Sequence, residues 1–175
     1  RDRGRGANTS GAFHGAATRA AIGTLPVVFQ VSNNASGRGT SVEMASAEPE
    51  QWKRASAYRM HGERVDGNDL LAVMEASDRL LRRAREERLP ALLETMTYRF
   101  RGHSVADAGK IYRDTEEVAE ARRHDPIDRF VAQQGIDAEA VKRIRGEVNV
   151  EIDAAIRQAA ADPAPDPDNL FDNVY

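Results

Sequence analysis

The chain has 175 residues, of which 41% are hydrophobic and 30% charged, proportions typical of a folded globular protein. Its net charge of -3 argues against a general nucleic-acid binder, and its lack of cysteine excludes disulfides, thiol nucleophiles and cysteine-ligated zinc. No apolar run approaches the roughly 20 residues that span a bilayer, and no signal peptide is recognisable. We therefore expect a cytoplasmic protein that binds neither membrane nor nucleic acid.

The chain begins with helix and strand patterns in alternation. The polar opening, RDRGRG, is predicted to be unstructured. Residues 11–23 are rich in alanine and end in glycine, which predicts a short helix. The β-branched run 25–31 predicts a buried strand of parallel type, and residues 32–41 have the composition of a turn.

The middle of the chain carries the clearest helical pattern. A short helix is predicted around Trp52 within residues 47–62, and residues 64–69 predict a brief strand and a turn. Asn68 or Asp69 then caps the next helix. Apolar residues recur there at helical spacing, which predicts an amphipathic helix covering a sheet. They are Leu70, Leu71, Val73, Met74, Leu80, Leu81 and Ala84.

A second buried strand is predicted over residues 89–98, followed by a loop that reaches residue 113. Helices are predicted over residues 114–134 and 137–161. The second helix has an apolar stripe, which we assign to the core or to a subunit interface. The stripe consists of Val141, Ile144, Val148, Ile152, Ile156 and Ala159.

This alternation of strands and helices predicts an α/β fold. We expect a mostly parallel sheet with helices on both faces and a helical C-terminal region. One domain is expected over residues 1–175, with the sheet and its loops in 1–113 and the helical region in 114–175.

Two predicted loops leave strand ends, where ligands bind in open α/β sheets. Residues 98–113 contain three arginines, a histidine and a serine, groups suited to binding phosphate and to moving a proton. Residues 32–41 contain Asn33 and Asn34, and amide and backbone carbonyl oxygens are ligands for Mg²⁺. The alternative for residues 98–113 is a solvated surface loop whose arginines pair with nearby carboxylates. The alternative for residues 32–41 is an ordinary turn.

Four segments together resemble the α subunit of the thiamine-diphosphate-dependent E1 component of 2-oxo acid dehydrogenases, of the pyruvate or acetoin type. They are LPVVFQVSNNASGRGTSVEMASA, ERVDGNDLLAVMEA, TYRFRGHSVADAGKIYR and DPIDRF. The resemblance runs from about Gly4 to Tyr175 and implies the C-terminal half of a thiamine-diphosphate-binding E1 α domain. It also implies an E1 β subunit in an α2β2 heterotetramer and the lipoyl domain of the E2 acyltransferase as partners.

The resemblance implies thiamine diphosphate and Mg²⁺ as cofactors and assigns residues to them. Gly4 and Gly6 correspond to glycines that let backbone N–H groups approach the diphosphate, and Ala7 corresponds to a neighbouring contact. Asn34 corresponds to a side-chain Mg²⁺ ligand, and Ser36 to a residue that supplies its backbone carbonyl.

The loop after the second strand receives the catalytic assignment. His103 corresponds to the active-site histidine near the cofactor diphosphate, where it positions groups and transfers protons. Arg99 is expected either to meet the diphosphate or to form structural ion pairs. Ser41 and Ser104 match positions that are phosphorylated in animal relatives.

Arg5 departs from the family pattern, because it stands where the family has its Mg²⁺-binding aspartate. A cation about 4 Å from the metal repels it, by roughly 4 kcal/mol per unit-charge pair at an effective dielectric constant of about 20. Gly15 and Thr18 also depart from the pattern. We interpret the cluster of departures as an N-terminal junction, such as a truncated or frame-disturbed coding region.

The predicted function is oxidative decarboxylation of pyruvate with transfer of the acyl group to a lipoyl domain, by a chain that is inactive alone. The alternative is a non-catalytic subunit-interaction protein that has lost cofactor binding through Arg5. The sequence does not decide which 2-oxo acid, or acetoin, is the substrate. Binding of RNA by RDRGRG is disfavoured, because the segment is short, lacks aromatic residues and belongs to an acidic chain.

Overall fold

A computed structural model of the chain describes residues 2–4, 10–34, 36–37, 40–41, 47–101 and 115–172. For residues 2–4, 36–37 and 40–41 it describes the backbone alone. The chain divides into two compact units, Arg1–Phe130 and Val131–Tyr175.

The first unit is built on a four-stranded sheet in the order β1-β2-β6-β5, with every neighbouring pair parallel. The strands are β1 (Asp2–Gly4), β2 (Val28–Asn33), β5 (His61–Asp66) and β6 (Ala91–Met96). The short strands β3 (Ser36–Gly37) and β4 (Thr40–Ser41) form a separate antiparallel pair. The predicted parallel sheet is thus confirmed.

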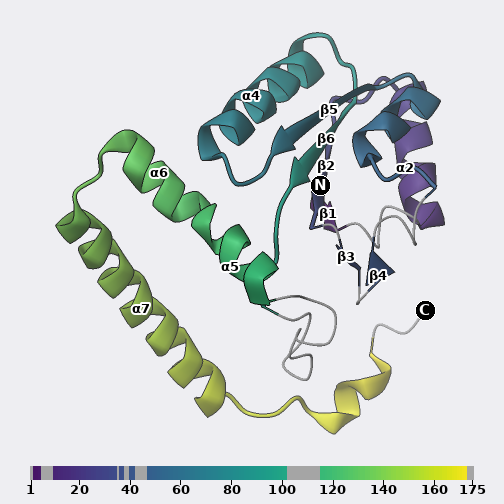
Figure 1. Cartoon of the computed structure of the whole chain (residues 1–175). Coiled ribbons are helices and arrows are strands. Elements are labelled where there is room, and N and C mark those ends of the chain that lie inside the picture. The colour runs from purple at the N-terminus through teal and green to yellow at the C-terminus, as the bar shows by residue number, and fades with distance from the viewer. Residues whose placement is uncertain are drawn as a thin grey trace. The chain divides into compact units, whose positions relative to one another are not determined.

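Helices cover both faces of this sheet, as Figure 1 shows for α4 and α2. They are α2 (Gly11–Ile22), the 3-10 helix η1 (Gln51–Tyr58) and α4 (Leu70–Glu86). Phe13 of α2 and Ala55 of η1 pack on one face with Phe29, Val31 and Leu92. On the other face, Leu80 and Ala76 of α4 pack with Ala91 and Leu93. Successive residues of β6 therefore pack in opposite cores, which explains why Ala91, Leu92 and Leu93 are all apolar.

The helix α4 begins as predicted, because the side chain of Asp69 accepts a hydrogen bond from the Ala72 N–H at 3.0 Å. The predicted apolar stripe is partly wrong: the buried residues are Ala76, Leu80 and Ala84. Leu70, Leu71, Met74 and Leu81 are 37–58% exposed. Two small alanines let the helix approach the sheet closely, so the bulkier side chains are turned to its flanks.

The polar opening is not unstructured over residues 2–4. Asp2–Gly4 forms β1 and pairs with β2, with Asp2 opposite Gln30 and Gly4 opposite Ser32. Its composition carries no strand signal, because the pairing depends on the exposed edge that β2 presents and not on local propensity.

The helical region after residue 114 is confirmed, with different boundaries. It consists of α5 (Thr115–Arg123), α6 (Pro126–Gln134), α7 (Ala138–Ala161) and the 3-10 helix η2 (Pro167–Phe171). The single helix predicted over 114–134 is wrong: Pro126 cannot continue α5, and the Asp125 side chain accepts a hydrogen bond from the Ile127 N–H at 2.8 Å.

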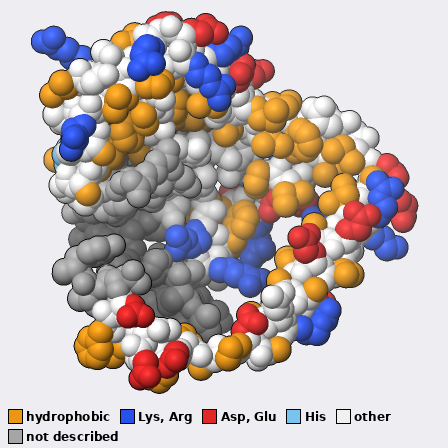
Figure 2. All heavy atoms as spheres, turned by 180° about the vertical axis from the view of Figure 1, so that it is seen from behind, with side chains coloured by type: hydrophobic (Ala, Val, Ile, Leu, Met, Phe, Trp, Pro, Cys, Tyr) orange, Lys and Arg blue, Asp and Glu red, His pale blue; other side chains and the backbone are white. Residues whose placement is uncertain are grey.

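The stripe of α7 does not lie in a core of the second unit. Ile144, Val148, Ile152 and Ile156 are 46–60% exposed, and charged and hydrophobic side chains alternate along the helix (Figure 2). The alternative assignment to a subunit interface stays a prediction. Within the described ranges, no helix has the length and apolar character needed to cross a bilayer.

Candidate functional site

The carboxyl ends of the four parallel strands meet at one edge of the sheet (Figure 1). Asn33 of β2 lies opposite Met96 of β6, and Met96 lies opposite Asp66 of β5. Beyond the strands, the Thr97 N–H donates to the Asn33 carbonyl at 2.9 Å. Gly4 pairs with Ser32, one residue before the end of β2. Three segments predicted to hold the cofactor therefore start from neighbouring strand ends, about 4.8 Å apart.

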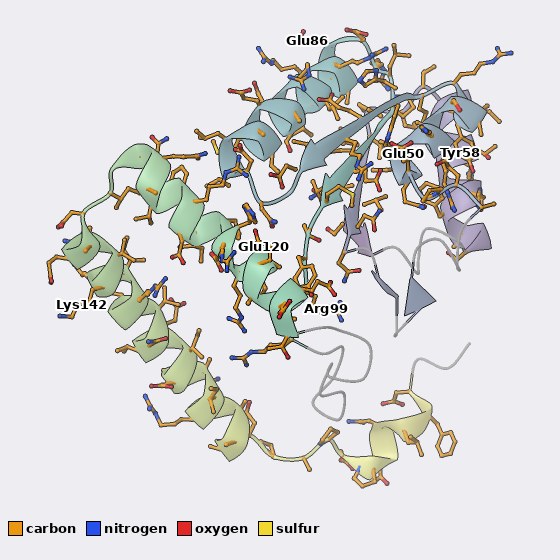
Figure 3. All side chains as sticks on the ribbon, in the orientation of Figure 1. Glu50, Tyr58, Glu86, Arg99, Glu120 and Lys142 are labelled. Atoms are coloured by element: carbon orange, nitrogen blue, oxygen red, sulfur yellow. The ribbon has the colours of Figure 1, made fainter. Side chains whose placement is uncertain are left out.

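The structure places only some of the predicted site residues. Asn34 is half-buried directly after β2, and Arg99 is half-buried between β6 and α5 (Figure 3). Gly4 lies in β1 and Ser36 in β3, each described by its backbone. The other predicted site residues lie outside the described part of the chain. They are Arg5, Gly6, Ala7 and His103, together with Ser104.

The start of the loop after β6 is held by aromatic contacts. The rings of Tyr98 and Phe100 lie 6.0 Å apart, and the Arg122 guanidinium of α5 lies over the Phe100 ring, 5.3 Å from its centroid. Arg99 lies between these two aromatic residues in the sequence. The sequence analysis missed the contact of Phe100 with α5, because it joins separate helix and loop segments.

The turn after β5 lies in close backbone contact with the end of β6. The Gly67 N–H donates to the Met96 carbonyl at 2.7 Å, and a Cβ added to Gly67 would lie 2.5 Å from the same oxygen. Arg129 of α6 bonds Asp66 at 2.8 Å and Asp69 at 2.6 Å, and so fastens α6 to this turn. The sequence analysis missed Arg129, although DPIDRF was one of the segments it singled out.

The ion pair with Arg129 affects the ionisation of Asp66. Partial burial raises the pKa of Asp66, but hydrogen bonds from the Asn68 N–H and from Arg129 outweigh it. The resulting pKa lies below the ordinary value of an aspartate. Protonation of Asp66 therefore weakens the attachment of α6 to the sheet edge.

Replacing Asp66 by Asn is expected to lower the free energy of unfolding at neutral pH by about 0.2–1 kcal/mol, the range for solvent-screened ion pairs. Because the folded-state pKa is depressed, this stabilisation is present above the unfolded-state pKa of about 3.9 and is lost as the pH falls through the folded-state pKa. Urea unfolding of wild type and Asp66→Asn at neutral and strongly acidic pH measures the difference.

Asp78→Asn is the matched control, because Asp78 pairs with Arg82 within α4 and both side chains are 63–65% exposed. We expect it to change the free energy of unfolding less than Asp66→Asn does at neutral pH. A difference between wild type and Asp66→Asn that persists undiminished in strong acid would contradict the assigned role of the carboxylate.

Mg²⁺ binds through oxygen ligands, and this edge of the sheet offers two of them. Asn34 offers one amide oxygen and Ser36 one backbone carbonyl, both suitable but neutral. Among the described residues, no group of three or more acidic or histidine side chains is placed to hold a metal ion. The resemblance implies Arg5 in place of the expected carboxylate, so Asn34 and Ser36 supply two neutral oxygens of the predicted magnesium site and no charged one.

A buried carboxylate also escaped the sequence analysis. Glu94 lies near the end of β6, within a run predicted only as an apolar strand. A charged residue between leucine and methionine positions of a buried strand is the signal that identifies it.

Comparisons with known proteins find relatives that align over nearly the whole chain. Residues 3–168 match the protein family described as "Dehydrogenase E1 component". The chain is 40% identical over 177 aligned positions to the human pyruvate dehydrogenase E1 component subunit alpha, testis-specific form, mitochondrial. It is 41% identical to the somatic form of pig and 36% identical to the chloroplastic subunit alpha-3 of Arabidopsis thaliana. The alignments cover 98% of this chain but 45%, 45% and 41% of those relatives.

Proposed function

Because the chain belongs to the dehydrogenase E1 component family, as a relative of pyruvate dehydrogenase E1 alpha subunits, we propose that it acts as part of an E1 α subunit. In this function it joins an E1 β subunit in an α2β2 heterotetramer. The assembly decarboxylates pyruvate oxidatively and transfers the acyl group to the lipoyl domain of an E2 acyltransferase. The chain spans less than half the length of these relatives, so this activity belongs to the assembly.

One observation carries the proposal: the segments that contain Gly4, Asn34 and Arg99 leave adjacent strand ends at one edge of the sheet. Such an edge is where open α/β sheets bind ligands. A chance resemblance of separate motifs would not require their strands to be neighbours.

Within the proposed site, each residue type has a defined task. Thiamine diphosphate, when bound, supplies the group that stabilises the carbanion left by decarboxylation. The Asn34 amide oxygen would serve as a ligand for Mg²⁺, and the Arg99 guanidinium offers a cation for the diphosphate. His103 is proposed to position the reacting groups and to transfer a proton during decarboxylation or acylation of the lipoyl group. We also propose a cytoplasmic location for the chain.

The second candidate is a subunit-interaction protein without catalysis. It is favoured by Arg5, which replaces a carboxylate in the donor set. Under this candidate, the chain still binds an E1 β subunit, but the complex takes up no thiamine diphosphate.

Calorimetric titration of thiamine diphosphate with Mg²⁺ into the complex of this chain with an E1 β subunit tests both candidates. We expect Arg5→Asp to tighten binding by at least about 10-fold, because it replaces repulsion of the metal by attraction. His103→Ala is expected to lower the rate of pyruvate decarboxylation by at least about 100-fold without removing binding. A β complex that binds no cofactor, even with Arg5→Asp, would support the non-catalytic candidate.

A further inference from the structure

Glu94 places a carboxylate in the interior of the first unit. It is 0% exposed, and Asn33 beside it is 2% exposed. The Glu94 Oε1 atom accepts a hydrogen bond from Asn33 Nδ2 at 2.6 Å, and its Oε2 atom accepts one from the Trp52 backbone N–H at 3.1 Å. Each oxygen therefore has its own donor, and the two donors come from different segments of the chain.

The two donors stand at the ends of one connection. Asn33 is the last residue of β2, and Trp52 is the second residue of η1. The connection between them contains Asn34 and Ser36, two of the predicted ligand residues. Glu94 itself lies two residues before the end of β6, where the loop toward Arg99 begins. One side chain thus contacts both ends of the connection that contains the first predicted site loop, and it belongs to the strand that leads into the second.

A buried carboxylate is not needed to stabilise this part of the fold. The neighbouring β6 residues Leu92 and Leu93 fill their places with apolar atoms, and well-packed apolar residues often stabilise as much as buried polar groups do. An apolar residue makes no directional contacts. The two carboxylate oxygens of Glu94 accept hydrogen bonds at fixed positions, and these bonds determine where Asn33 and the first turn of η1 lie.

We propose that Glu94 is a positioning residue that anchors both ends of the connection between β2 and η1, and thereby fixes Asn34 at the sheet edge. Glu94 acts through Asn33 and Trp52 and touches no ligand. The consequence for cofactor binding rests on the proposed function, whereas the anchoring itself does not.

Glu94→Met tests the proposal in the complex with an E1 β subunit. Methionine has a similar length but no oxygen, so it accepts a hydrogen bond from neither Asn33 Nδ2 nor the Trp52 N–H. We expect amide hydrogen exchange at Trp52 to become about 10- to 100-fold faster, the factor that corresponds to losing a hydrogen bond to a charged group. The dissociation constant of thiamine diphosphate, measured by calorimetry, is expected to rise about 10-fold or more on the same basis.

The double variant Asn33→Asp/Glu94→Gln exchanges the carboxylate and the amide and keeps both contacts. The introduced glutamine donates to the introduced aspartate and accepts from the Trp52 N–H, and the buried negative charge lies on residue 33 instead of residue 94. Recovery of slow exchange and of cofactor affinity supports positioning. If Glu94→Met gives no folded complex, folding of the double variant supports the proposal, and its failure to fold overturns the proposal. Glu86→Gln, on the exposed side of α4 (Figure 3), is the control and should change neither quantity.

The readouts separate this proposal from the proposed function. A wild-type complex that binds no thiamine diphosphate contradicts the proposed function, and exchange at Trp52 then decides the anchoring alone. Unchanged exchange at Trp52 in Glu94→Met overturns the proposal. Faster exchange with unchanged cofactor affinity, in a complex that does bind the cofactor, also overturns it, because the anchor would then have no effect on the site.

Discussion

Phe13→Ala is expected to lower the free energy of unfolding by about 3–5 kcal/mol, the range for truncating a fully buried phenylalanine. Phe13 is 0% exposed and is the largest side chain that α2 contributes to the core. Its ring meets those of Phe29 and Tyr58 edge-to-face, with centroid distances of 5.9 Å and 6.4 Å. Alanine would leave a cavity between α2, β2 and η1 and remove both ring contacts.

The measurement is urea unfolding followed by the fluorescence of Trp52, the single tryptophan of the chain. Phe171→Ala is the matched control, because Phe171 is 81% exposed and its truncation should change stability by less than about 0.5 kcal/mol. A loss below about 1 kcal/mol for Phe13→Ala would show that α2 does not pack on the sheet as described.

Gly62→Ala is expected to destabilise the chain by about 3 kcal/mol or more, at the upper end of overpacking effects. A Cβ at Gly62 would lie 2.2 Å from the Trp52 carbonyl oxygen and 2.9 Å from the Ala55 Cβ. Both atoms belong to η1, and the carbonyl is backbone, so the clash is relieved only by moving η1 away from β5. That movement also pulls the Trp52 N–H from Glu94.

Gly146→Ala provides a control of opposite sign. Gly146 lies inside α7, and its added Cβ would meet no atom within 4 Å. Alanine there should favour the helix by about 0.5–1 kcal/mol. Thermal unfolding followed by circular dichroism compares the two variants. Equal and small effects of both substitutions would contradict the close contact between η1 and β5.

Local pattern was sufficient for the elements with strong periodicity or clear end signals. The helix closed by Gly23, the strand that contains Phe29 and the Asp69 cap are all found near their predicted positions. These features depend on residues within a few positions of one another, where side-chain spacing and capping chemistry act directly.

Local sequence pattern did not predict features that depend on contacts between residues far apart in the chain. Asp2–Gly4 becomes a strand because it pairs with β2, and Glu94 is buried because donors from Asn33 and Trp52 reach it. In α4, the approach of the helix to the sheet selects Ala76 and Ala84 for burial over larger apolar neighbours. In each case the contacting residues lie far apart in the chain, so local pattern does not identify which residues meet.

The sequence by itself determined the α/β class, the motifs after the strands and the resemblance that assigned their chemistry. Tertiary structure alone decided the strand order β1-β2-β6-β5 and so which strand ends are neighbours. Hydrogen-bonded pairing between strands far apart in the chain sets that order, and residue composition does not encode it locally. The same pairing brings the segments of Gly4, Asn34 and Arg99 to one edge, with Glu94 behind them.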